Sequence, residues 1–173
     1  RTVAITGHTR PDGDCVGSCM GLYNYIVDNY PDISVDIYLE TIADSYKLVK
    51  NTEAIRQPGT EPKVYDLFIC LDTSQKDRMT KGAELYFDAA KVTVNIDHHV
   101  SNTKFAGMNH VVVEASSASE VVYDLLNETK ISLSAAEALY MGIICDSGVF
   151  KFSSTSEHTM QIAGRLMGIG VDS

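Results

Sequence analysis

Acidic and imidazole side chains follow apolar runs at four places in this sequence. The densest group is Asp97-His98-His99, which ends the alternating apolar run 92–96. Three ionisable side chains at the end of a buried strand are costly unless a partner compensates their charge. For this stretch alone, an exposed loop with two chance histidines is the alternative. The other three places carry His8, Asp12 and Asp14, then Asp72, then Asp146, so that the sequence offers ligands for two divalent metal ions.

The first segment is His8-Thr9-Arg10-Pro11-Asp12-Gly13-Asp14, just after the short apolar run 3–5. Pro11 fixes its backbone φ and Gly13 permits a tight turn, so the two carboxylates can point in different directions. One imidazole and two carboxylates thereby meet at a single turn between a strand and a helix. The alternative is that Asp14 caps the helix that follows, but capping accounts for only one of the three groups.

Asp72 follows the uniformly apolar run 67–71, which is typical of a strand buried on both faces of a parallel sheet. Ligands of open parallel sheets bind beyond the carboxyl ends of the strands. We therefore expect His8, Asp72 and Asp97-His98 to lie along one edge. As alternatives, Asp72 could cap the next turn, and Asp146, close to Gly148, could form a turn.

Imidazole and carboxylate ligands without thiolates suit Mn²⁺ and tolerate Mg²⁺ or Co²⁺. Two such ions about 3.5–4 Å apart lower the pKa of a shared water and hold a phosphoryl group for in-line attack. One carboxylate should bridge the two ions. Asp72 is the natural candidate, because its strand is central in the expected strand order.

The apolar pattern predicts an α/β fold with a mostly parallel sheet of about five strands flanked by helices. We expect the metal site at the C-terminal edge of these strands. Helices are predicted at 16–30 and 83–90 and throughout the last third, whereas 43–62 is ambiguous. Serine and glutamate three residues apart predict helix starts at Ser117, Ser134 and Ser154. The predicted strands are 3–5, 33–39, 67–71, 92–96 and 111–113.

The chain has 173 residues, which fits one domain, and 45% hydrophobic residues, which indicates a globular protein. Its net charge of −9 argues against extended duplex nucleic acid as a partner. No apolar run is long enough to cross a membrane. The four cysteines, Cys15, Cys19, Cys70 and Cys145, are interpreted as small buried thiols, and we expect a cytoplasmic protein. The oligomeric state stays open, a homodimer included.

The four motifs, in their order, resemble those of the DHH phosphoesterase superfamily. The Pro11-Asp12-Gly13-Asp14 segment and the Val16-Gly17-Ser18 segment after it are most similar to the oligoribonuclease and phosphoadenosine-phosphate phosphatase branch. Arg78, six residues after Asp72, matches a basic position of that branch. The resemblance covers essentially the whole chain.

The resemblance implies a Mn²⁺-dependent phosphoesterase acting on a small nucleotide or a short oligonucleotide, such as 3′-phosphoadenosine 5′-phosphate. It implies that His99 faces the substrate phosphate together with Arg78, and that Asp97 orients the ligand imidazole through a hydrogen bond. Asp72, His99 and Asp97 would thus be the catalytic side chains. The implied metal ligands are His8, Asp12 and Asp72 for one ion, and Asp14, Asp72, His98 and Asp146 for the other.

One departure concerns a second, substrate-binding C-terminal domain that members of this branch carry. Nothing after Asp146 supplies its motif, so we expect residues 1–173 to be the catalytic domain alone. The first alternative function is an inorganic pyrophosphatase or exopolyphosphatase, although its members in the superfamily carry a bulkier residue than Gly13. The second is a metal-dependent nucleotide sensor without turnover. The remaining basic and imidazole residues are interpreted as surface or structural: Arg10, Lys76, Lys104, Lys151, His110 and His158.

Overall fold

The computed structural model describes residues 1–173 and contains one six-stranded sheet in which every neighbouring pair is parallel. The strand order is β3-β2-β1-β4-β5-β6, so that β1 and β4 are central. The strands are β1 (Thr2–Thr6), β2 (Ser34–Tyr38), β3 (Ile55–Arg56), β4 (Leu67–Leu71), β5 (Val92–Asp97) and β6 (Met108–Val111). The predicted α/β fold is confirmed.

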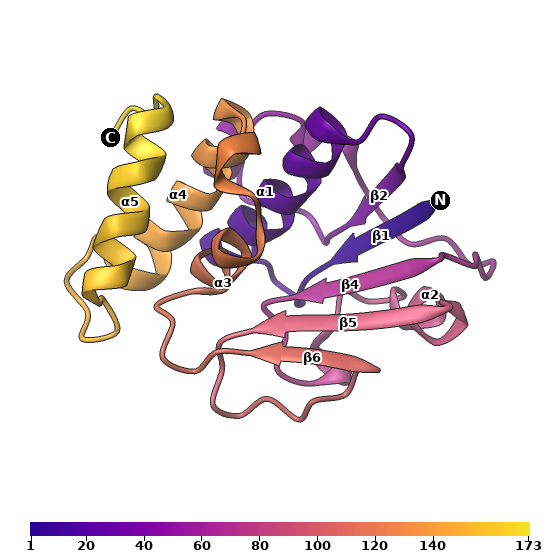
Figure 1. Cartoon of the computed structure of the whole chain (residues 1–173). Helices are drawn as coiled ribbons and strands as arrows, with labels where there is room; N and C mark the ends of the chain where they lie inside the picture. Colours follow the sequence, from indigo (N-terminus) through magenta and orange to yellow (C-terminus); the bar gives the residue numbers. More distant parts are fainter.

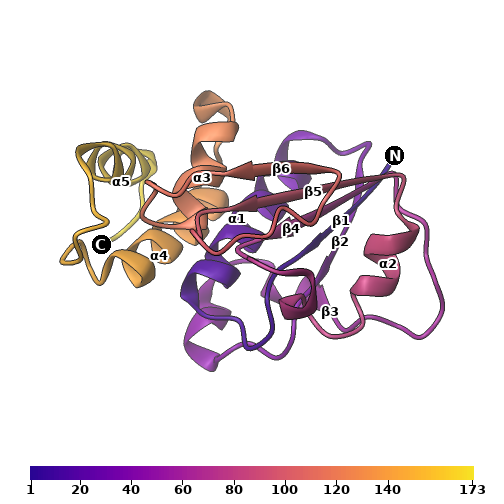
Figure 2. The same ribbon diagram turned by 90° about the horizontal axis from the view of Figure 1, so that it is seen from below.

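Helices cover both faces of the sheet. Alternate residues of β1 and β4 point to opposite faces: Ile5 and Ile69 join the large core under α1, α3, α4 and α5, whereas Ala4 and Phe68 join a smaller core with α2. In Figure 1 the arrowheads of β1, β4, β5 and β6 point toward the side where α3, α4 and α5 lie, and Figure 2 shows α2 at the other end of the strands from α4 and α5. The helices are α1 (Gly13–Asn29), α2 (Glu84–Ala89), α3 (Ala118–Leu125), α4 (Leu133–Ser147) and α5 (Glu157–Ile169), with short 3₁₀ turns at Asp44–Leu48, Thr52–Ala54, Lys76–Arg78 and Glu128–Lys130.

Helices α1 and α4 pack with their backbones almost in contact. A Cβ atom on Gly17 would lie 2.6 Å from the carbonyl oxygen of Ala138 and 2.7 Å from the Cα of Gly142. A side chain at Gly21 would likewise run into Leu139, 2.5 Å away. Small residues therefore set the distance between these helices, and this contact brings the start of α1 beside the end of α4.

Two strands differ in detail from the sequence predictions. The two-residue strand β3 lies in the ambiguous segment and is too short to leave an alternating pattern. The predicted strand 111–113 forms earlier, at Met108–Val111, where it pairs with β5. None of the helices is long and apolar enough to cross a bilayer.

Two predicted helix starts are also wrong by two residues. Helix α4 is capped by Ser132, whose hydroxyl accepts from the N–H of Ala135, and α5 by Ser156, which exchanges hydrogen bonds with Thr159. Ser134, the predicted cap of α4, instead lies inside that helix, and Ser154 precedes α5. Only Ser117 caps the helix that was predicted to follow it.

Candidate metal centre

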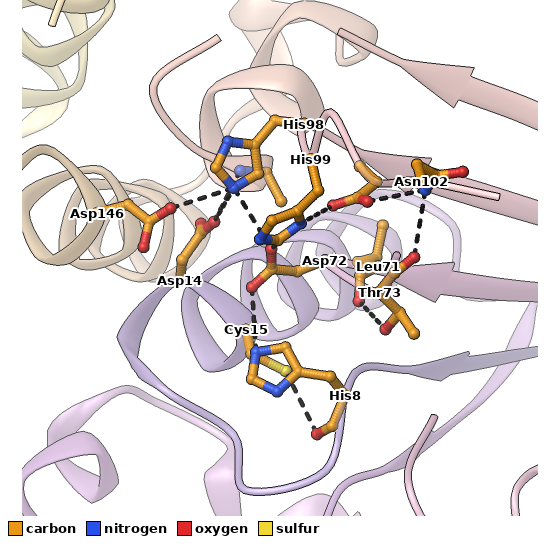
Figure 3. Close-up of polar contacts among 12 residues, drawn as sticks. His8, Asp14, Cys15, Leu71, Asp72, Thr73, His98, His99, Asn102 and Asp146 are labelled. Carbon is orange, nitrogen blue, oxygen red and sulfur yellow. Dashed lines mark hydrogen bonds and ion pairs between the residues drawn. The ribbon is translucent and has the colours of Figure 1, made fainter. Parts of the chain in front are cut away.

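The predicted ligands come from the C-terminal ends of three strands and from two helices. His8 follows β1, Asp72 follows β4, and His98 follows β5 directly. Three more carboxylates come from helices: Asp12 and Asp14 from the start of α1, and Asp146 from the last turn of α4. Figure 3 shows His8, Asp14, Asp72, His98 and Asp146 converging on one region.

The first half of the cluster is built on His8. Its Nε2 lies 3.5 Å from the Asp12 Oδ1 and 3.4 Å from the Asp72 Oδ2. The other ring nitrogen, Nδ1, lies 2.7 Å from the Thr9 carbonyl oxygen, so an N–H there leaves Nε2 free for a metal. Burial opposes a charged ring, but hydrogen bonds to Asp12 and Asp72 outweigh it and raise the pKa of His8.

Asp12 also caps α1, because its Oδ1 accepts from the Cys15 N–H at 2.9 Å. The cap of α1 is therefore Asp12, and the alternative that Asp14 caps this helix is wrong. Burial raises the pKa of Asp12, while the hydrogen bonds from His8 and from the helix N-terminus lower it, and the net shift is downward. The charged carboxylate thus belongs to both the helix end and the cluster.

The second half of the cluster is built on His98. Its Nε2 lies 3.1 Å from the Asp146 Oδ2, 3.6 Å from the Asp14 Oδ2 and 3.6 Å from the Asp72 Oδ1. Burial lowers the pKa of His98, but the nearby carboxylates of Asp146 and Asp72 raise it to about 11. Without a cation, three carboxylates thus hold a proton on this ring.

Asp14 is fully buried and is held by the N-terminus of α3. Its Oδ2 accepts from the Ala118 N–H at 2.7 Å, and its Oδ1 accepts from the backbone N–H and the hydroxyl of Ser119. Burial raises its pKa well above the usual value, and the charges of Asp72 and Asp146 raise it further. A carboxylate in this position needs additional positive charge to stay ionised.

Asp72 stands between the two halves. Its backbone is left-handed, with φ 52°, while its N–H still donates to the Ile96 carbonyl. The two carboxylate oxygens face different histidines, Oδ2 toward His8 and Oδ1 toward His98. The Asp72 Oδ1 and the His98 Nε2 are buried and have no hydrogen-bond partner, which is unusual for polar atoms. One cation held by these two atoms would satisfy both, and the Asp72 Oδ2 together with His8 offers ligands for a second, so the residues fit the predicted pair of metal sites.

Asp97 orients His99 rather than His98, contrary to the expectation that it supports the metal-ligand imidazole. The His99 Nδ1–H donates to the Asp97 Oδ1 at 2.7 Å, whereas the His98 Nδ1 faces the Ala115 carbonyl at 3.4 Å. The alternation of side chains explains the difference, because Asp97 and His99 point to the same side of the extended chain. The hydrogen bond to Asp97 raises the pKa of His99.

Asn102 and Ser119 were missed by the sequence analysis. Asn102 donates from Nδ2 to the Asp97 Oδ2 at 2.8 Å and to the Asn95 Oδ1 at 2.8 Å, and thereby fixes Asp97. Ser119 holds Asp14, as described above. Neither residue has a sequence signal of its own, since polar residues in a loop or a helix start are common. The only sequence indication of a role for Asn102 is that it lies three residues after His99.

A polar cavity of about 340 Å³ opens beside the first half of the cluster, and none of the nine residues that line it is hydrophobic. His8, Asp12 and Asp72 form one wall. His99 and Arg78, which were predicted to contact substrate, both line it, and so does Arg10, which was interpreted as surface.

Among the remaining histidines and cysteines, only Cys15 lies close to the ligand atoms of the cluster. His158 pairs with Asp124 at 2.8 Å on the surface, and His110 is exposed on β6. The sulfur of Cys15 lies within 4.8 Å of ligand atoms of His8 and Asp72. All four cysteines are free, but Cys145 is exposed, which corrects the prediction of four buried thiols.

Comparison with known proteins gives the same family as the motifs. Residues 2–143 match the model of the DHH family, N-terminal domain. The chain is 31% identical over 175 residues to the probable bifunctional oligoribonuclease and PAP phosphatase NrnA of Streptococcus mutans, covering 99% of the chain and 54% of the relative. It is 31% identical to the corresponding enzyme of Bacillus subtilis, with 96% and 52% covered. The chain thus spans about half the length of the curated relatives it matches.

Solved structures show the same fold. An exopolyphosphatase-related protein from Bacteroides fragilis superposes with a TM-score of 0.87 at 25% identity, covering 99% of this chain and 53% of the other. A putative family II inorganic pyrophosphatase of Methanococcus jannaschii gives 0.65 at 20% identity, covering 99% and 57%, and supports the fold only. By its matched domain and its relatives, the chain belongs to the DHH family.

Proposed function

We propose that this chain is the catalytic part of a metal-dependent phosphoesterase that acts on a small nucleotide or a short oligoribonucleotide. The substrate class is a phosphomonoester or phosphodiester such as 3′-phosphoadenosine 5′-phosphate or a dinucleotide. The observation that carries the proposal is the position of Asp72, whose two carboxylate oxygens face two separate sets of ligands. The oligoribonuclease and PAP phosphatase relatives support the substrate class.

In this proposal His8, Asp12 and Asp72 hold one ion, and Asp14, Asp72, His98 and Asp146 hold the other. The donor set of imidazoles and carboxylates favours Mn²⁺, with Mg²⁺ or Co²⁺ as substitutes. When bound, the two ions supply Lewis acidity toward phosphoryl oxygens and make water a better nucleophile.

Among the protein's own side chains, His99 is the one that donates a proton or a hydrogen bond to the substrate. Its Nδ1–H is engaged by Asp97, so Nε2 is the nitrogen left for the substrate in the cavity. The raised pKa of His99 favours the imidazolium, which can donate a hydrogen bond to a phosphate oxygen or a proton to the leaving oxygen. Asp97 and Asn102 hold the ring in that orientation. Arg78, on the cavity wall, pairs with the phosphate.

A panel of substrates tests the proposal. The full-length protein should release phosphate or nucleotide from adenosine 3′,5′-bisphosphate and from a diribonucleotide with Mn²⁺, and lose this activity in a chelator. Activity that returns on adding Mn²⁺, and more weakly with Mg²⁺, would agree with the donor set. Equal activity in the presence and absence of the chelator would contradict the proposed role of the metals.

Inorganic pyrophosphate or polyphosphate is the second candidate substrate. It is favoured by the absence of apolar residues in the cavity and by the exopolyphosphatase-related structural neighbour. Gly13 no longer argues against it, because a Cβ there would lie 2.2 Å from the Cys145 sulfur, so packing alone requires the glycine. Turnover of pyrophosphate without turnover of nucleotides would select this candidate. Metal and nucleotide binding without any turnover would select a sensor.

The substrate-binding energy is proposed to come partly from a further domain, because the chain covers about half of its relatives. Binding energy from groups remote from the reacting bond lowers the barrier as well as KM. Residues 1–173 alone should then bind Mn²⁺ but turn over nucleotides with a kcat/KM lower by orders of magnitude than the full-length protein. Comparable values for the two would contradict this division.

A further inference from the structure

The composition of the cavity wall beside His8 is unusual for a ligand site. Ligand pockets of about 300–1,000 Å³ are mostly lined by hydrophobic and aromatic side chains. This cavity, with about 340 Å³, is at the lower end of that range and has no hydrophobic lining residue. No phenylalanine, tyrosine or tryptophan lines it, and its only aromatic rings are the imidazoles of His8 and His99. The chemistry of the wall suits a compact, highly charged part of a ligand.

Two arginines enter this cavity from adjacent segments. His8 pairs with Met79 as an antiparallel bridge, and the Thr9 N–H donates to the Arg78 carbonyl at 2.7 Å. This pairing places Arg78 beside Thr9 and hence close to Arg10. The Arg10 backbone is left-handed, with φ 50°, and its N–H donates to the Glu40 carboxylate at 2.9 Å. The turn that carries Arg10 is thereby tied to the end of β2.

Neither guanidinium is neutralised by the protein. Arg10 and Arg78 form no ion pair with a carboxylate, although the chain has a net charge of −9. Lys76, only two residues from Arg78, does pair, with Asp88 at 2.5 Å. Unpaired guanidiniums on a cavity wall point to an anionic ligand, and their planar fork of donors matches phosphate oxygens.

We propose that Arg10 binds a second phosphate of the substrate, next to the phosphate that is hydrolysed, and so determines specificity for substrates with two phosphoryl groups. This inference rests on the proposed function and deepens it. The metal cluster and His99 account for one phosphate, and Arg10 and Arg78 both lie on the wall of the same cavity. Arg10 then favours substrates that carry a second phosphate, whichever nucleobase they contain.

The test compares Arg10→Met with the wild type in the full-length protein with Mn²⁺. The methionine keeps a flexible apolar stem and removes the charge. The substrates are adenosine 3′,5′-bisphosphate, guanosine 3′,5′-bisphosphate and p-nitrophenyl phosphate, which has one phosphate. We expect kcat/KM to fall about ten- to hundredfold for both bisphosphates, mainly through KM, and to change less than about threefold for p-nitrophenyl phosphate. Arg10→Lys should restore part of the loss.

Lys76→Met is the matched control, since it removes a nearby cation that is already paired with Asp88 outside the cavity. It should leave both classes of substrate unchanged. An equal loss on all three substrates in Arg10→Met would overturn the inference and would indicate a general role in the site. No loss on the bisphosphates would overturn it as well.

A binding measurement separates this inference from the proposed function. Calorimetry compares adenosine 3′,5′-bisphosphate with adenosine 5′-monophosphate in the presence of Mn²⁺. The wild type should bind the bisphosphate about tenfold or more tightly, and Arg10→Met should abolish this preference. The comparison holds even if the protein hydrolyses neither compound. Absent turnover would then count against the proposed function. Equal affinities of the wild type for the bisphosphate and the monophosphate would count against binding of the second phosphate by Arg10.

Discussion

Ser119 donates two hydrogen bonds to Asp14, a residue 105 positions earlier in the chain, at 2.9 Å from its backbone N–H and 2.7 Å from its hydroxyl. The start of α3 thus supports a carboxylate at the start of α1. This support matters because Asp14 is fully buried among other acids, and burial raises its pKa. Ser119, which was not predicted to be a ligand, therefore supports the candidate metal centre.

Ser119→Ala should weaken Mn²⁺ binding at the site of Asp14, His98 and Asp146. Loss of a hydrogen bond that orients a ligand typically costs about 10- to 100-fold in metal affinity. Titration calorimetry should show this loss for one of two ions. Ser134→Ala is the control, because its hydroxyl bonds Asp28 far from the cluster, and Mn²⁺ affinity should not change. Equal affinities in the two variants would remove the supporting role of Ser119.

Asp72→Asn should weaken both metal sites, whereas His8→Ala should weaken one. The reason is the shared position of the Asp72 carboxylate between His8 and His98. Asparagine tolerates the left-handed backbone at position 72, so the fold should persist. Two-site Mn²⁺ titrations distinguish the variants, with circular dichroism as a check of folding. Loss of the same single site in both variants would contradict bridging by Asp72.

Asn102→Ala should lower kcat by about tenfold or more while leaving Mn²⁺ affinity near the wild-type value. Asn102 fixes Asp97, which orients His99, and none of these contacts reaches His98. The pKa of His99, followed by NMR, should move toward its ordinary value as the Asp97 hydrogen bond loosens. Asn109→Ala, which removes only two local hydrogen bonds with Ala106, should leave kcat and the His99 titration unchanged. A matching drop in metal affinity would place Asn102 in a purely structural role.

Mn²⁺ binding should release protons and strengthen with rising pH between about 6 and 8. Burial lowers the pKa of His98, but Asp146 and Asp72 raise it to about 11, so its ring carries a proton at neutral pH in the metal-free protein. A metal needs the lone pair of Nε2, and that proton must leave. The raised pKa of Asp14 acts in the same direction.

Calorimetry in buffers of different ionisation enthalpy measures this release, which should reach about one proton or more for the two ions. His158→Ala is the control, because this histidine pairs with Asp124 on the surface, and the number of protons released should not change. An enthalpy independent of the buffer would show that the ring of His98 is neutral before the metal binds.

The sequence was informative where side chains follow buried strands. The run 67–71 predicted both β4 and the position of Asp72, because a strand buried on both faces has a nearly continuous apolar sequence. The convergence of His8, Asp72 and His98 followed from parallel strands having their carboxyl ends at one edge. Asp146 was predicted only through its motif, and it comes from the end of a helix rather than from a strand.

Other features depend on contacts that a single sequence does not record. The hydrogen bonds of Asp97 and Asn102 depend on the path of a loop, and the role of Ser119 depends on how α3 meets α1. Arg10 was interpreted as surface because an exposed cation is usually solvated. Only the bridge between His8 and Met79 brings it beside Arg78.

The close contact of α1 with α4 has a consequence for natural variation in this protein. Asp14 and Asp146 belong to different helices, and Gly17 and Gly142 set how near those helices come. A single methyl group at Gly17 would push the backbones apart and move one ligand away from the other. A natural variant with Gly17→Ala should therefore bind metal as poorly as a variant that lacks one of the ligands, although every ligand residue is still present.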